Sequence, residues 1–255
     1  MPSMNNIELP THSRELVSKV EQTLQAASQY YLADAQLLSH LYGLGFRADC
    51  VFDVGASNTI WSVMAHVIYP KARFELFEPL AEIAPAYKSE KLLHPAVLNF
   101  VTVANHRTHA IALGNENKTA RFNQFEQSAG STSLELNWES DAFDVIEVPM
   151  RRMEDFVREE NLPRPQILKL DTQGAELEIL KGSGDLLDMV EVVFIETWLQ
   201  KGYGAHTPLL LNVANLLHDK GLELFDVGDC FRDEAGLIVT YDTVFVRSDA
   251  GWLRA

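Results

Sequence analysis

Cysteine is scarce in this 255-residue chain, which has only Cys50 and Cys230. Their spacing matches no metal-binding pattern, and we expect both to be small buried side chains that stay reduced. The chain also lacks an uninterrupted apolar run of about 18 residues, the length needed to cross a membrane. Its N-terminus lacks the charged-then-apolar pattern of a secretory signal. These absences predict a cytoplasmic location and no membrane partner.

Positive charge is sparse as well. The chain has 21 Lys and Arg against 36 Asp and Glu, for a formal net charge of −15. Arg151-Arg152 is only a pair, and we find no basic cluster that could follow a phosphate backbone. Nucleic acid is therefore not an expected partner. The hydrophobic content of 47% is sufficient for the core of one large domain.

The most informative stretch is residues 50–80, CVFDVGASNTIWSVMAHVIYPKARFELFEPL. An apolar run ends at Gly55-Ala56, a segment at helical spacing follows, and a second apolar run ends at Glu78-Pro79. This is the strand–turn–helix–strand unit of a nucleotide-binding sheet. Glu78 stands 25 positions after Asp53, where a carboxylate can accept both hydroxyls of a ribose. The predicted ligand is an adenosine-type cofactor.

Strands and helices alternate along the rest of the chain. We predict helices over 13–27, 31–41, 59–69, 81–103 (breaking near Pro95), 153–160, 174–181 and 209–220. Predicted strands are 51–54, 73–77, 108–113, 118–122, 145–148, 166–170, 190–195, 223–227 and 243–247. The alternation indicates an α/β fold with a mostly parallel sheet, covered on both faces, and an antiparallel edge near the C-terminus. The N-terminal helices cover either a sheet end or a partner subunit.

Ligand sites in such sheets lie beyond the carboxyl ends of the strands. The polar residues predicted to gather there are Asp53, Ser57, Asn58, Glu78, Asp171, Gln173 and Glu196. The small, hydroxyl-rich loop 127–137 is either a solvated connection or a cover over the cofactor. Lys169 either reaches a carboxylate such as Glu196 or lies in solvent at the strand edge.

Six stretches together resemble the FkbM-type S-adenosylmethionine-dependent methyltransferases. They are VFDVGASNTIWS (51–62), FELFEP (74–79), IALGNENKTARF (111–122), GSTSL (130–134), ILKLDTQGAELEILKG (167–182) and YDTVFVR (241–247). The resemblance implies a Rossmann-like class I methyltransferase fold with a mostly parallel seven-stranded sheet. It runs from about residue 45 to 248, so we expect an S-adenosylmethionine-binding domain (45–255) after the N-terminal helical extension (1–44) that the helical pattern predicts. It also implies O-methylation of a hydroxyl on a sugar or small natural product.

The resemblance also suggests roles for individual residues. Glu78 matches the ribose-binding acid, and Asp171 matches the acid beside the transferable methyl group. Thr59 stands where the family usually has a second glycine, and we expect Asn58 or Thr59 to cap the helix instead. The implied cofactor-binding residues are Asp53, Gly55, Ala56, Ser57, Asn58, Glu78, Pro79, Ala112, Leu113, Ser131 and Asp171.

Methyl transfer to a hydroxyl needs in-line positioning and a group that removes the hydroxyl proton. The candidates for that group are Asp171, His206, Glu196 and His106, with Asp171 preferred because it directly follows a buried strand. No metal is expected, because no ligand spacing is dedicated to one.

Two other functions stay open at this stage. One is an NAD(P)-dependent oxidoreductase, although the turn lacks the G-x-G-x-x-G that admits a pyrophosphate. The other is a non-catalytic protein that binds a small molecule on the same fold. The expected partner is a small-molecule acceptor, and the amphipathic N-terminal helices make a homodimer plausible.

Overall fold

The computed structural model describes residues 11–81, 94–125, 131–132, 143–202 and 204–254. Their central feature is a seven-stranded sheet in the order β10-β11-β9-β8-β1-β2-β3. Its strands are β1 (Cys50–Val54), β2 (Arg73–Phe77), β3 (His106–His109), β8 (Ile167–Leu170), β9 (Val192–Trp198), β10 (Leu222–Arg232) and β11 (Ile238–Arg247). All neighbouring pairs are parallel except those that β11 makes with β9 and β10. The predicted Rossmann-like class I fold, with its antiparallel edge, is confirmed.

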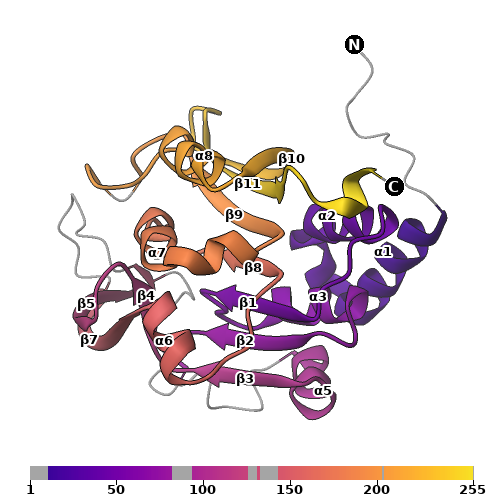
Figure 1. The fold of residues 1–255 in the computed structure, drawn as a ribbon, viewed down its shortest axis with the longest axis horizontal. Helices are drawn as coiled ribbons and strands as arrows, with labels where there is room; N and C mark the ends of the chain where they lie inside the picture. The colour runs from indigo at the N-terminus through magenta and orange to yellow at the C-terminus, as the bar shows by residue number, and fades with distance from the viewer. Residues whose placement is uncertain (1–10, 82–93, 126–130, 133–142, 203, 255) are drawn as a thin grey trace.

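Helices cover both faces of this sheet, as Figure 1 shows. One face packs against α1 (Thr11–Leu24), α2 (Leu32–Gly43), α3 (Ile60–Ile68) and α5 (Pro95–Val103). The other packs against α6 (Met153–Glu159), α7 (Glu176–Gly182) and α8 (Leu210–Asp219). Alternating residues of β1 divide between the two cores: Val51 joins the first, and Phe52 the second. The central strands read as continuous apolar runs because both of their faces are buried.

The N-terminal helices share the main core. Leu38 of α2 is fully buried in the same cluster as Val51 of β1 and Ile167 of β8. Of the two alternatives for these helices, cover for the sheet is therefore the one that the structure supports. Short 3-10 turns connect or close the helical segments at η1 (Gln25–Tyr30), η2 (Gly184–Met189) and η3 (Gly251–Arg254).

A second sheet was not predicted. It has the order β4-β7-β5-β6, formed by β4 (Ala112–Gly114), β5 (Lys118–Phe125), β6 (Ser131–Thr132) and β7 (Phe143–Arg152). The prediction of one strand over 108–113 is wrong, because the chain leaves the main sheet after His109 and enters the second sheet at Ala112. Its small apolar core includes Leu80, Ala112 and Phe122. The second sheet thereby brings Ala112 and Leu113 toward the end of β2.

Several predicted boundaries also shift. The helix predicted over 81–103 is observed from Pro95, where His94 caps its first turn through Nδ1, while 82–93 lie outside the described residues. The last two strands are much longer than predicted. The strand predicted to finish at Glu196 continues to Trp198, since β11 pairs with it along its whole length. Glu196 is consequently a residue within a strand and not one of a terminal turn.

Candidate active site

Two adjoining cavities open at the carboxyl ends of β1, β2 and β8. The first has a volume of about 200 Å³, and its lining includes Gly55, Ser57, Glu78, Pro79, Ala112, Leu113 and Asp171. The second has a volume of about 250 Å³ and is lined in part by Gly55, Ala56, Ser57, Asn58, Asp171 and Glu196. Gly55, Ser57 and Asp171 belong to both linings. The turn after β1 therefore separates two connected compartments, and most of the predicted site residues border them.

Gly55 is required at this turn. Its φ is +76°, and a Cβ placed on it would lie 1.9 Å from the carbonyl oxygen of Asp171. Ser57 and Thr59 also have left-handed backbone, with φ of 42° and 67°. Thr59 thus keeps the conformation that favours glycine, although it carries a branched side chain. Asn58, not Thr59, caps the helix, because its Oδ1 accepts a hydrogen bond from the Ile60 amide at 3.1 Å.

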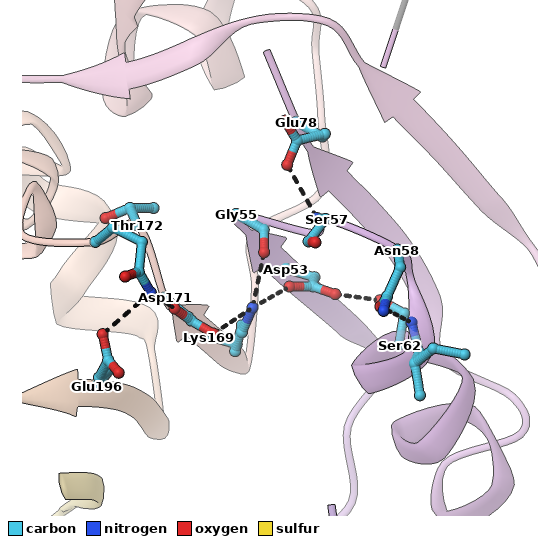
Figure 2. Close-up of polar contacts among 12 residues, drawn as sticks. Asp53, Gly55, Ser57, Asn58, Ser62, Glu78, Lys169, Asp171, Thr172 and Glu196 are labelled. Carbon is cyan, nitrogen blue, oxygen red and sulfur yellow. Dashed lines mark hydrogen bonds and ion pairs between the residues drawn. The ribbon is translucent and has the colours of Figure 1, made fainter. Parts of the chain in front are cut away.

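Glu78 follows β2 and bridges two backbone segments (Figure 2). Its carboxylate accepts a hydrogen bond from the Ser57 amide, drawn in Figure 2, and another from the Leu80 amide, each at 2.9 Å. Burial raises the pKa of Glu78, and the two amide donors offset part of this effect. Each carboxylate oxygen has a further lone pair available for a hydroxyl donor. The turn after β1 and the end of β2 are therefore held in fixed relation around one carboxylate.

Lys169 lies beneath the turn, not in solvent. Its Nζ is 3.0 Å from Asp53, 3.8 Å from Asp171 and 2.9 Å from the Gly55 carbonyl, to which it donates a hydrogen bond. Burial lowers the pKa of Lys169, but the Asp53 and Asp171 carboxylates outweigh it and the net direction is upward. The predicted partner Glu196 is not the one observed.

Asp53 is fully buried and lines neither cavity. Its second oxygen accepts a hydrogen bond from the Ser62 hydroxyl at 2.6 Å. Asp53 thus ties β1 to both Lys169 and α3, and contacts the turn through Lys169. This geometry gives Asp53 a supporting position under the predicted cofactor residues.

The turn after β8 is organised by Glu176. Its Oε1 accepts hydrogen bonds from the Thr172 and Gly174 amides at 2.8 and 3.1 Å. Gln173 donates to Asp171 at 3.0 Å and to Glu196 at 3.3 Å, so that one amide orients two cavity carboxylates. Asp171 lines both cavities, and no side chain caps the start of α7 (Glu176–Gly182).

Four carboxylates line the second cavity, namely Asp34, Asp171, Glu196 and Asp242. Burial, together with the neighbouring Asp171, raises the pKa of Asp242 to about 7. Burial likewise raises the pKa of Glu196 well above its usual range, with Asp171 adding to the effect. Burial and the neighbouring Asp242 also raise the pKa of Asp34.

Other predicted residues lie elsewhere. His206 is exposed in the turn before α8, and His106 is at the amino end of β3, opposite the cavities; neither lines them. Ser131 lies in β6, where its backbone pairs with Gln124. Its side chain and most of the loop 127–137 are outside the described residues. In the part of the chain that the structure describes, no group of three or more His, Cys, Asp or Glu side chains could hold a metal ion.

Sequence reasoning missed Asp34, Tyr31 and Asp242, which all line the second cavity. Tyr31 and Asp34 come from the N-terminal helical segment, whose pattern signals only its packing stripe. Asp242 sits within β11 in register with Glu196. Two signals were available for Asp242, namely its place in the family-like stretch YDTVFVR (241–247) and its position just before the apolar run 244–246. Antiparallel pairing, which sequence alone does not specify, brings these two acids together.

A comparison with family models identifies the family of this chain. Residues 53–224 match the model of the "Methyltransferase FkbM domain". This chain belongs to the FkbM methyltransferase family. A protein from Beauveria bassiana, "Methyltransferase 1", is 24% identical over 179 residues, which are 63% of this chain and 69% of that protein. "Methyltransferase sdnD" from Sordaria araneosa is 33% identical over 88 residues, spanning 31% of this chain and only 32% of that protein.

Solved structures give more distant matches. An FkbM methyltransferase from Methylobacillus flagellatus is 13% identical, with a TM-score of 0.47; the match covers 90% of this chain and 58% of that one. The magnesium protoporphyrin IX methyltransferase from Synechocystis, solved with bound S-adenosylmethionine, is 12% identical with a TM-score of 0.43. That match covers 95% of this chain and 87% of the other. Within the described residues, no helix is both long and apolar enough to cross a bilayer.

Proposed function

We propose that this protein transfers the methyl group of S-adenosylmethionine to a hydroxyl of a sugar or small natural product. The observation that carries the proposal is the position of Glu78, held by the Ser57 amide between the β1 turn and the first cavity. A buried carboxylate there can receive ribose hydroxyls. The first cavity would take the adenosine part, with Ala112, Leu113 and Pro79 along its apolar side.

The residues present fit that cofactor. Side-chain-free backbone at Gly55 allows close approach, and Gly55, Ser57 and Asp171 connect the first cavity to the second. When bound, the cofactor supplies an electrophilic methyl group. In our proposal Gly55 to Asn58 border its methionine part, and Asp171 lies beside the methyl group. The second cavity would then hold the acceptor.

The chain's contribution is positioning and proton removal. Holding an acceptor oxygen about 3 to 3.5 Å from the methyl carbon provides much of the acceleration in such a displacement. Glu196 lines the second cavity, and burial raises its pKa, which makes its carboxylate a stronger base for a substrate proton. Among the candidate proton acceptors from the sequence, Asp171 and Glu196 line the second cavity and His206 does not, which favours the two carboxylates.

Calorimetry tests the cofactor assignment. We expect S-adenosylhomocysteine to bind the purified protein with one site, and NAD and NADP not to bind. Binding of a dinucleotide without S-adenosylhomocysteine would instead favour an oxidoreductase. Methyl transfer from labelled S-adenosylmethionine to a panel of hydroxylated acceptors would then separate an enzyme from a non-catalytic binding protein. A cytoplasmic location and a homodimer remain predictions.

A further inference from the structure

Asp242 lines the second cavity beside Glu196. It lies on β11, and its Cα is in register with that of Glu196 on the neighbouring β9. Directly paired residues of an antiparallel ladder point to the same face of the sheet and lie close together. Both side chains line the second cavity, together with Asp171 and Lys169. The two carboxyls therefore form a pair at the end of the acceptor compartment.

A second observation indicates that a ligand belongs beside this pair. Asp34 of α2 is only 6% exposed and lines the same cavity. No described residue gives its carboxyl a hydrogen bond or an ion pair. Lys169, a cation in the lining of the same cavity, is already engaged by Asp53 and by the Gly55 carbonyl. A buried, unpartnered carboxyl needs a donor, and the cavity is the space from which a bound molecule can supply one.

We propose that Asp242 and Glu196 together form the proton acceptor for the substrate hydroxyl, and that Asp34 is a positioning residue that keeps the pair receptive to a proton. This rests on the proposed function. In the step, the hydroxyl O–H bond breaks and its proton passes to a carboxylate oxygen of the pair. The oxygen forms a bond to the methyl carbon, and the methyl–sulfur bond breaks with its electron pair left on sulfur. The proton then leaves to solvent.

The charges around the pair support this role. The groups that face it are Asp34 on α2, Lys169 on β8, Asp171 after β8, Glu176 on α7 and Asp229 on β10. Most are acids, so like charges and burial together favour proton uptake over ionisation. Gln173 restrains Glu196 through its hydrogen bond at 3.3 Å. A carboxyl pair that shares protons near neutral pH can both accept and release one.

The test uses binding, so it needs no known acceptor. Sinefungin is an analogue of S-adenosylmethionine that carries an amino-bearing carbon in place of the methyl sulfonium. Its ammonium should face the pair, so the wild-type protein should bind sinefungin at least about 10-fold tighter than S-adenosylhomocysteine at pH 8. This preference should decline as the pH falls through 7 and the pair takes up protons.

Three variants and one control make the test specific. Asp242→Asn and Glu196→Gln should each remove most of the preference for sinefungin while leaving the affinity for S-adenosylhomocysteine within about 2-fold. Asp34→Asn should shift the pH midpoint of the preference downward, because it removes a like charge. The control Asp188→Asn has the same change in charge on a half-exposed residue paired with Lys220, and should behave like the wild type.

Two results would overturn the inference. One is an undiminished preference in Asp242→Asn. The other is an equal loss of affinity for both ligands, which would mean that the acids hold the cofactor. If S-adenosylhomocysteine does not bind the wild-type protein, the proposed function itself fails. Once an acceptor is known, the kcat of the wild-type protein should rise with pH as the pair loses its protons. Asp242→Asn should lack this rise.

Discussion

At the scale of single residues, the β1 turn depends on the absence of a side chain at Gly55. A Cβ there would overlap the Asp171 carbonyl oxygen, at 1.9 Å, in a backbone with φ of +76°. Gly55→Ala should therefore lower the free energy of unfolding by more than the 1–2 kcal/mol or so of left-handed strain, and should abolish binding of S-adenosylhomocysteine. Chemical denaturation and calorimetry measure the two effects.

Gly236 provides the matched control. Its φ is +80°, but no atom lies within 4 Å of the added Cβ. Gly236→Ala should introduce only the left-handed strain, which lowers the free energy of unfolding by about 1–2 kcal/mol, and should keep full ligand affinity. Equal destabilisation in the two variants would contradict the close approach of the two turns.

Lys169 and Asp53 form a second residue-scale test. Their side chains are 6% and 0% exposed and 3.0 Å apart. Lys169→Met should cost about 3–5 kcal/mol of unfolding free energy, because it leaves a buried carboxylate without its cation. The double variant Lys169→Met with Asp53→Asn should be more stable than Lys169→Met alone. If denaturant titrations show that the losses of unfolding free energy in Lys169→Met and Asp53→Asn simply add in the double variant, the two residues are not coupled.

At the scale of helices and strands, the N-terminal segment is part of the core that carries the site. We propose residues 1–44 as a helical extension to the domain of residues 45–255, and α2 contributes both core and cavity residues. Leu38→Ala should lower the unfolding free energy by about 2–5 kcal/mol, in one cooperative transition. The control is Leu211→Ala, at a residue that is 73% exposed on α8. It should change the free energy of unfolding by less than about 0.5 kcal/mol. A separate early transition in Leu38→Ala would show that the extension unfolds independently.

The elements also show what the sequence can and cannot predict. The parallel strands were predictable because buried apolar runs end at Gly55-Ala56, Glu78-Pro79 and Asp171, and strand ends in such sheets converge on one edge. The division of 106–114 between two sheets was not, since no glycine or proline stands between β3 and β4 and only tertiary pairing separates them. The Asp242–Glu196 pair likewise depends on an antiparallel register across 46 positions of chain.

At the scale of the whole molecule, the acids of the second cavity make stability depend on pH. The pKa of Asp242 is raised to about 7 in the folded protein, above its ordinary value near 4 in an unfolded chain. Between these values the folded state binds more protons than the unfolded state, so this group's contribution to stability falls as pH rises from about 4 to 7.

Asp242→Asn should remove that contribution. We expect the free energy of unfolding, measured by denaturant titration from pH 5 to 8, to fall less steeply in the variant than in the wild type. The comparison cancels His66, whose pKa is lowered by burial and whose contribution has the opposite sign. Parallel curves for the two proteins would contradict the burial of an uncompensated carboxyl at Asp242.

The most direct test of the whole account is the affinity for S-adenosylhomocysteine of wild type and Glu78→Gln, measured by calorimetry. Replacing a charged acceptor of ribose hydroxyls should cost about 1.5–3 kcal/mol, or roughly 10- to 150-fold in Kd. The control is Glu75→Gln, which changes a buried acid within β2, the strand before Glu78. Glu75 pairs with Arg73 and His109, and this variant should leave the Kd within about 2-fold. A wild-type protein that does not bind, or a Glu78→Gln variant with unchanged affinity, would contradict the account.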